Sequence, residues 1–147
     1  MKVGVAGCGR IATSVHMPSL KKIKGYDLVA ACDPDHARLQ EAKDRFDLDE
    51  IYYDYRRMLA EADIDAVFVC TPPETHFQIV MDSLERGKHV FCEKPLASSV
   101  EDGLTIKKTY EMQRKTVSEN LFLMPAHNYV FTPCFIEALK LIEREEI

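Results

Sequence analysis

Two groups of residues have the types and the spacing to do chemistry. The first is a glycine-rich turn, Gly7-Cys8-Gly9-Arg10-Ile11-Ala12, which directly follows a short apolar run. Such a turn lets the backbone approach a pyrophosphate, and the N–H groups at the start of the next helix then face the anion. Glycines also serve ordinary turns, so this motif alone is only weak evidence for a dinucleotide site.

The second group is Glu93-Lys94-Pro95, at the end of the apolar run 88–92. A lysine held beside a glutamate can donate a hydrogen bond to a substrate oxygen or tune a proton transfer. The same residues are equally typical of a surface ion pair ahead of a proline turn. Spacing alone leaves both interpretations open.

An acidic residue stands where a ribose would need it. Asp33 follows the apolar run 28–32, roughly 20 residues after the glycine turn, where the dinucleotide fold places a carboxylate that accepts from the ribose 2′-hydroxyl. A carboxylate there repels a 2′-phosphate, so Asp33 favours NAD, although adenine-side contacts elsewhere could still admit NADP. The alternative is that Asp33-Pro34-Asp35 only caps the next helix.

A third loop, Thr71-Pro72-Pro73-Glu74-Thr75-His76, leaves the apolar run 66–70. If that run is a parallel strand, the loop lies on the face where such sheets bind ligands. A lone histidine in a first helical turn is often simply solvated, so a ligand role for His76 and a bland role are both open.

The elements that position these residues alternate along the chain. Apolar runs predict strands at 3–6, 28–32, 51–53, 66–70, 88–92 and 116–123. Helices are expected over 10–23, 35–46, 55–62, 72–86, 98–114 and from 132 onward, whereas 124–131 reads as irregular. The alternation implies an α/β fold with a doubly wound, mainly parallel sheet.

Local signals refine these elements. Pro18 should kink the first helix or split off its last turn. Ser98-x-x-Glu101 reads as a capping box, and the tyrosines near position 53 as half-buried packing. Phe135, Ile136, Leu139 and Ile142 form one apolar face of the last helix, which needs a surface to cover it.

Composition excludes several classes of protein. The net charge of −5 does not favour nucleic acid or an anionic membrane as a partner. No apolar run approaches the roughly 20 residues of a membrane helix, and no signal peptide is visible. Five cysteines without a Cys-x-x-Cys pair predict reduced core thiols in a cytoplasmic protein, with no disulfide set and no metal site.

Together, the glycine turn, Asp33, Thr71–His76 and Glu93-Lys94-Pro95 resemble the nucleotide-binding half of the glucose–fructose oxidoreductase/inositol dehydrogenase/rhizopine catabolism protein (Gfo/Idh/MocA) family. The resemblance covers essentially the whole chain. It implies an NAD(P)-dependent oxidoreductase that transfers a hydride between nicotinamide and a sugar, polyol or related substrate, as a homo-oligomer in the full-length protein. The alternative is a nucleotide-binding module without catalysis, acting as a truncated product, a sensor or a partner subunit.

The resemblance also implies roles for the matched residues. The pyrophosphate is held by Gly7, Gly9 and Ala12, with the backbone near Arg10 and Ile11, and the adenosine ribose by Asp33. The cofactor cleft is lined by Thr71, Pro72 and His76, with Glu93 near the nicotinamide ribose. Lys94 is the catalytic candidate: it would contact the substrate hydroxyl and support hydride transfer, and the Lys94–Pro95 bond is expected to be cis.

Residues 124–131 resemble the family's entry into a second domain, where Asn128 and Tyr129 could approach substrate. That passage often reads Tyr-Arg-Phe in the family, whereas this chain has Tyr129-Val130-Phe131. We expect a Rossmann domain over 1–120 and the beginning of a truncated second domain over 121–147. The second domain commonly contributes an Asp and a His, so the 147-residue chain alone is expected to bind cofactor with little or no activity.

Overall fold

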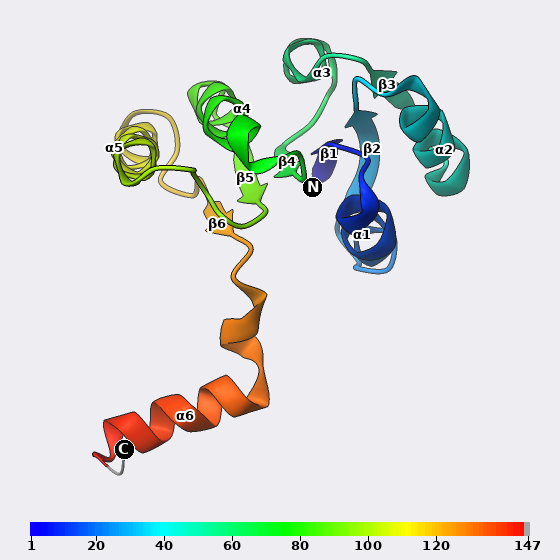
Figure 1. Ribbon diagram of the computed structural model, residues 1–147. Coiled ribbons are helices and arrows are strands. Elements are labelled where there is room, and N and C mark those ends of the chain that lie inside the picture. Colours follow the sequence, from blue (N-terminus) through cyan, green and yellow to red (C-terminus); the bar gives the residue numbers. More distant parts are fainter. Residues whose placement is uncertain (146–147) are drawn as a thin grey trace.

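The computed structural model describes residues 1–145, which form a parallel six-stranded sheet with helices on both faces (Figure 1). The strands are β1 (Lys2–Ala6), β2 (Asp27–Cys32), β3 (Glu50–Tyr52), β4 (Ala66–Val69), β5 (His89–Cys92) and β6 (Leu123–Pro125). Their order is β3-β2-β1-β4-β5-β6, with every neighbouring pair parallel. The order reverses between β1 and β4, which is the point where doubly wound sheets bind ligands. The predicted fold class is confirmed.

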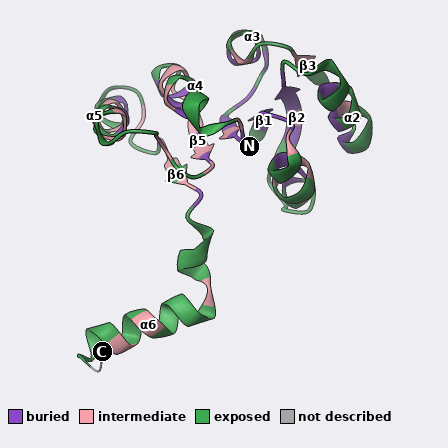
Figure 2. Cartoon of the chain, viewed as in Figure 1, coloured by how far each residue is buried: buried purple, intermediate pink, exposed green. Residues whose placement is uncertain are grey.

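Helices cover the sheet in two layers because successive strand residues point to opposite faces. One face carries η1 (Ala12–His16), α1 (Met17–Leu20) and α2 (His36–Phe46), packed with strand residues such as Val3 and Val5. The other carries α3 (Tyr55–Glu61), α4 (Pro73–Glu85) and α5 (Val100–Thr116), packed with residues such as Val67 and Val69. Figure 2 shows the buried positions on the strands and on the helix sides that face them. Burial on both faces explains the continuous apolar runs.

The first helix is shorter and less regular than expected. Helical structure begins at residues 10 and 11, continues as a π-helix over Ala12–His16, and ends with α1 at Leu20 instead of residue 23. In the π turn, the Met17 N–H donates to the carbonyl of Ala12. The wider turn lies just before Pro18, whose ring would crowd a carbonyl of a regular helix, so the irregularity precedes the proline.

Two predictions for the region around α5 were wrong. The N-cap of α5 is Ser99, whose hydroxyl accepts from the Asp102 N–H at 3.0 Å, and not Ser98. The predicted strand over 116–123 fails because α5 runs through Thr116, and β6 begins only at Leu123. Pro125 is tolerated because β6 is an edge strand, where one missing N–H breaks no ladder.

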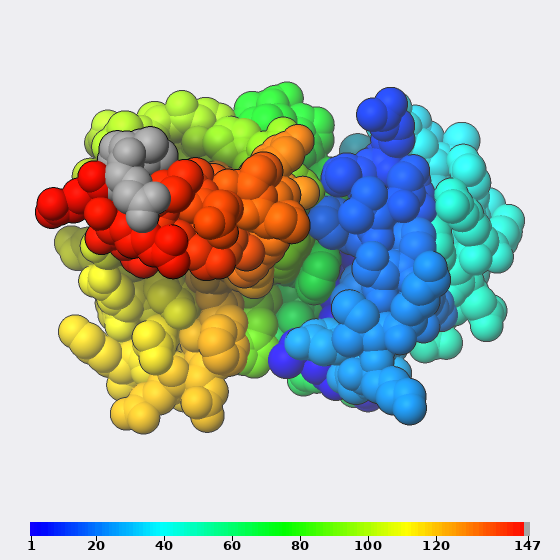
Figure 3. All heavy atoms as spheres, turned by 90° about the horizontal axis from the view of Figure 1, so that it is seen from below, coloured from blue at the N-terminus to red at the C-terminus, as the bar shows by residue number. Residues whose placement is uncertain are grey.

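After β6 the chain leaves the sheet as an arm, which we define as residues 126–145. It contains a 3₁₀-helix, η2 (Asn128–Phe131), and α6 (Pro133–Glu143), close to the helix predicted from residue 132 (Figure 1). No residue of α6 is buried, and the four side chains of its predicted apolar face, Phe135, Ile136, Leu139 and Ile142, are 40–56% exposed. Figure 3 shows the arm over the half that holds α5, with the first two βα units left open to view. Within residues 1–145, no helix has the length and apolarity to span a membrane.

Candidate functional site

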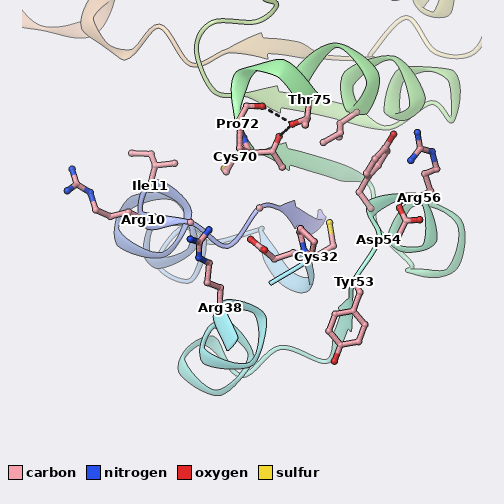
Figure 4. A pocket seen from close by; sticks show the side chains of 17 residues that line it. Arg10, Ile11, Cys32, Arg38, Tyr53, Asp54, Arg56, Cys70, Pro72 and Thr75 are labelled. Atoms are coloured by element: carbon pink, nitrogen blue, oxygen red, sulfur yellow. Dashed lines mark hydrogen bonds between the residues drawn. The ribbon is translucent and has the colours of Figure 1, made fainter. Parts of the chain in front are cut away.

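A cleft of about 730 Å³ opens at the carboxyl edge of the sheet, where β1 and β4 meet (Figure 4). Its walls come from the ends of β1, β2, β3 and β4 and from the helices that follow them. Its volume falls in the range of small-molecule and cofactor sites. Most of the predicted cofactor residues line it: Gly7, Gly9, Arg10, Ile11, Asp33, Thr71 and Pro72.

Glycine occupies positions 7 and 9 of the turn for different physical reasons. Gly7 has φ +92°, and a Cβ there would lie 2.8 Å from the carbonyl carbon and oxygen of Cys70, so the fold itself requires glycine. A Cβ at Gly9 would meet nothing within 4 Å, although Gly9 lines the cleft. The open space at Gly9 is the cradle that a pyrophosphate needs, beside the first N–H groups of the following helix. The residues present therefore fit a dinucleotide.

Asp33 is built into the wall of the cleft. It is 6% exposed, and its two carboxylate oxygens accept from the backbone N–H groups of Cys8 at 2.7 Å and Asp35 at 2.8 Å. The cap of α2 is Asp35, which accepts from the N–H groups of Ala37 and Arg38. Asp33 thus fixes the glycine turn to the end of β2. An ionised carboxylate has about four acceptor positions, so two remain for a ligand hydroxyl.

The cleft also contains cationic and aromatic residues that sequence reasoning missed. Arg38 and Arg56 line it; their Nε atoms lie 3.4 Å from Asp35 Oδ2 and 3.6 Å from Asp82 Oδ2. In Figure 4 the Arg38 side chain extends from α2 toward the turn after β1. With Arg10, these side chains place three guanidinium groups around the cleft, beside the carboxylates of Asp33 and Asp54. The sequence offered one indication for Arg38: it lies one turn into the helix that follows the strand ending just before Asp33.

Tyr53 is a second residue that was missed. It directly follows β3, is 53% exposed and lines the cleft, and its ring stacks on His36 with centroids 3.8 Å apart. The prediction of half-buried packing was therefore wrong for Tyr53. Because β3 is the neighbour of β2, the end of β3 reaches the same edge of the sheet as Asp33. That strand order could have indicated that Tyr53 lines the cleft.

Burial keeps the thiols near the cleft in their protonated form. Burial, with a contribution from the Asp33 charge, raises the pKa of Cys8 to about 12. Burial, with a contribution from Glu93, likewise raises the pKa of Cys92 to about 12, and burial raises the pKa of Cys32 and Cys70. These four cysteines are free and buried, as predicted. Within residues 1–145, no group of three or more His, Cys, Asp or Glu side chains could hold a metal ion.

His76 lies behind the cleft wall and not in it. The residue is fully buried, and its ring nitrogens lie 2.7 Å from the Pro95 carbonyl oxygen and 2.8 Å from that of Thr71. His76 is not among the residues that line this cleft, because the first turn of α4 presents its ring to the loop after β5. His76 connects the loops that follow β4 and β5.

Glu93 and Lys94 stand at the end of β5, and neither is among the residues that line the cleft. Lys94 is exposed, and the bond between Lys94 and Pro95 is cis, as expected. Glu93 Oε1 lies 2.7 Å from Nε2 of His16, and Oε2 accepts from the Lys94 N–H at 3.2 Å. His16 was missed because its partner is 77 residues away, a separation that no local pattern reveals.

Two of the three predicted substrate residues lie on the arm. Asn128 and Tyr129 belong to η2, and Tyr129 is 76% exposed. Neither lines the cleft.

Ala12 is fully buried beneath the turn, as close packing of helix and strand requires.

The strand order, the glycine turn after β1 and the carboxylate after β2 define a dinucleotide-binding Rossmann domain. Comparison with known families agrees: the model described as "Oxidoreductase family, NAD-binding Rossmann fold" (GFO_IDH_MocA) matches residues 1–121. The chain belongs to the Gfo/Idh/MocA family of oxidoreductases, as its sequence motifs predicted.

Individual relatives support the assignment. The chain is 38% identical over 102 residues to myo-inositol 2-dehydrogenase of Thermotoga maritima, which covers 69% of this chain and 30% of that protein. It is 31% identical over 144 residues to the uncharacterized oxidoreductase YrbE of Bacillus subtilis, covering 98% of this chain and 40% of that one. Scyllo-inositol dehydrogenase from Lactobacillus casei, solved with NAD(H) and scyllo-inositol, gives a TM-score of 0.88 at 30% identity, covering 100% of this chain and 42% of that chain. This chain thus spans less than half the length of these relatives.

Proposed function

We propose that these residues form the cofactor-binding half of an NAD-dependent oxidoreductase that transfers a hydride between nicotinamide and a sugar, polyol or related hydroxyl or carbonyl compound. The observation that carries the proposal is the cleft, where Gly9 faces open space beside the buried carboxylate of Asp33. The substrate class rests on relatives named as inositol dehydrogenases and on the Lactobacillus casei structure with scyllo-inositol.

In this proposal each wall of the cleft holds one part of the dinucleotide. The backbone of Gly9, Arg10 and Ile11 holds the pyrophosphate, and Asp33 accepts from the adenosine ribose. Tyr53, stacked on His36, offers a flat surface for the adenine ring. Thr71 and Pro72 form the opposite wall. Asp33 selects NAD, whereas Arg38 on the same wall is the cation that NADP would use.

The chemical step belongs to the end of β5. When bound, nicotinamide supplies the site that accepts or returns a hydride. In the oxidation direction, the exposed ammonium of Lys94 would donate a hydrogen bond to the substrate oxygen and stabilise the negative charge that develops there, while the hydroxyl proton passes to a base that we place in the second domain. We place Asn128 and Tyr129 on the substrate side, at the beginning of a second domain that starts after the sheet.

A second candidate is a nucleotide-binding module without turnover. It is favoured by the contrast between the formed cleft and the exposed positions of Lys94 and Tyr129. For the 147-residue chain alone we propose cofactor binding with little or no turnover. For the full-length protein we propose a homo-oligomer, and the free buried cysteines fit the cytoplasm.

The test is a fluorescence titration of NADH followed by turnover assays on a panel of sugars and polyols. Saturable NADH binding is expected, and Lys94→Ala should bind NADH as tightly as the unaltered chain because the Lys94 side chain is assigned to the substrate oxygen and the variant keeps the backbone N–H that Glu93 accepts from. Absence of binding at millimolar NADH would overturn the proposal. Turnover that is lost in Lys94→Ala would exclude the second candidate.

A further inference from the structure

One half-buried hydrogen-bonded pair of side chains is not explained by the proposed function. His16 Nε2 and Glu93 Oε1 lie 2.7 Å apart, with only 12% and 15% of their side chains exposed. We propose that His16 is a positioning residue for the nicotinamide end of the cofactor site, acting through Glu93 on the backbone of Lys94. This inference rests on the proposed function and extends it to a residue outside the cleft.

The location of the pair supports this role. The cleft is lined by residues from β1, β2, β3 and β4 and their loops, and none comes from β5. A dinucleotide crosses the edge of the sheet at the switch point, with one nucleotide on each side. With the adenosine on the β2–β3 side, the other nucleotide lies over β4 and β5. Glu93 directly follows β5, so the pair stands on the nicotinamide side.

The surroundings hold His16 in one orientation. Its ring meets the rings of Phe68 and Phe91 edge-on, at centroid distances of 6.0 and 5.1 Å, and those two rings stack on each other at 4.6 Å. The π turn that ends at His16 belongs to the helix that begins at the glycine turn. The helix next to the pyrophosphate is thereby connected to the end of β5.

Glu93 passes this constraint to Lys94. One carboxylate oxygen faces His16, and the other accepts from the Lys94 N–H at 3.2 Å. Apolar side chains at both positions, 16 and 93, would avoid removing a carboxylate from water. Replacing both partners of a buried hydrogen-bonded pair by well-packed apolar groups is often neutral or stabilising, so fold stability alone gives no reason for this pair.

The test compares two ligands and two variants in the 147-residue chain. Calorimetry measures NADH and ADP, which lacks the nicotinamide and its ribose. His16→Phe removes the donor to Glu93 and keeps an aromatic ring, whereas His16→Gln keeps an N–H group at a similar distance. We expect His16→Phe to weaken NADH binding about tenfold, equivalent to about 1.4 kcal/mol, and ADP binding less than about twofold. His16→Gln should restore NADH binding.

A second measurement needs no cofactor. In the ¹H–¹⁵N spectrum, the Lys94 amide signal should move in His16→Phe and return in His16→Gln, while the Thr75 amide, bonded to the Pro72 carbonyl, stays in place. Equal weakening of NADH and ADP, unchanged NADH binding, or an unmoved Lys94 signal would each overturn the inference. If ADP binds and NADH binding does not respond to His16, the inference fails while the proposed function stands. If neither ligand binds the unaltered chain, the proposed function fails, and the inference falls with it.

Discussion

The two sides of the sheet's carboxyl edge differ: one forms a concave site, and the other presents exposed groups. The adenosine side, which we define by the cleft residues between 7 and 79, is a concave site that includes buried residues such as Cys32, Asp33 and Cys70. The nicotinamide side, defined by Glu93–Pro95 and the arm, presents an exposed lysine and a helix without a buried residue. The difference supports the proposal that the adenosine part of the cofactor site lies within β1 to β4 and the loops that follow them.

The largest expected effect on stability comes from adding a side chain at Gly7, in the turn under the cleft. Gly7→Ala combines a positive φ with a Cβ 2.8 Å from the Cys70 carbonyl. Backbone strain and overpacking together should cost about 4 kcal/mol of unfolding free energy, measured by urea denaturation. Gly103→Ala in α5 is the matched control, because its Cβ meets nothing within 4 Å, and it should stabilise by about 0.5–1 kcal/mol. Equal effects at the two glycines would contradict the packing of this turn.

Two leucines contrast the packed sheet with the arm. Leu84 is fully buried in α4, and Leu139 is 44% exposed in α6. Leu84→Ala should cost about 3 kcal/mol, and Leu139→Ala less than about 0.5 kcal/mol, in the same urea experiment. A large loss at Leu139 would show that the arm is packed in solution and would remove the contrast.

A substitution at Gly9 should affect NADH binding without affecting the stability of the fold. Its Cβ would point into open space, so Gly9→Val should leave the unfolding free energy within about 0.5 kcal/mol. The same side chain occupies the space proposed for the pyrophosphate, so NADH binding should weaken at least about tenfold. Calorimetry and urea denaturation of one preparation measure both quantities. Unchanged NADH affinity would show that the cradle is not the phosphate site.

Alkaline pH should lower the free energy of unfolding, because buried thiols ionise more readily in the unfolded chain. In the unfolded chain the thiols ionise near their ordinary pKa of 9.0, whereas in the folded chain the pKa of Cys8 and of Cys92 is about 12. Because the folded pKa is raised, the unfolded state loses protons first, and stability present below pH 9 is lost progressively between pH 9 and 12. Each thiol should cost about 1 kcal/mol at pH 10 relative to pH 8. Urea denaturation of Cys8→Ala and Cys92→Ala should show a smaller pH effect than the parent chain, and an unchanged pH effect would contradict the assignment.

Local patterns predicted the parts of the molecule that local physics determines. The apolar runs gave five of the six strand locations to within a residue or two, because strands buried on both faces cannot avoid that composition. The glycine turn and Asp33 were found by spacing, since a ligand fixes their separation.

Long-range contacts could not be predicted in the same way. His16 meets Glu93 and Tyr53 meets His36 only through the order of strands, which no single segment contains. The contact of His76 with the Pro95 carbonyl could not be predicted, because its place in a first helical turn does not tell which loop its ring will face. The end of α5 was missed because Thr116 and Val117 favour strand locally, while packing of the helix decides otherwise.

The most direct test of the central claim is calorimetric titration of the 147-residue chain with NADH and then with ADP. The account predicts one site for NADH with a Kd below about 1 mM, occupied competitively by ADP because the adenosine side is complete within these residues. A chain that folds cooperatively and yet binds neither ligand at millimolar concentration would contradict it.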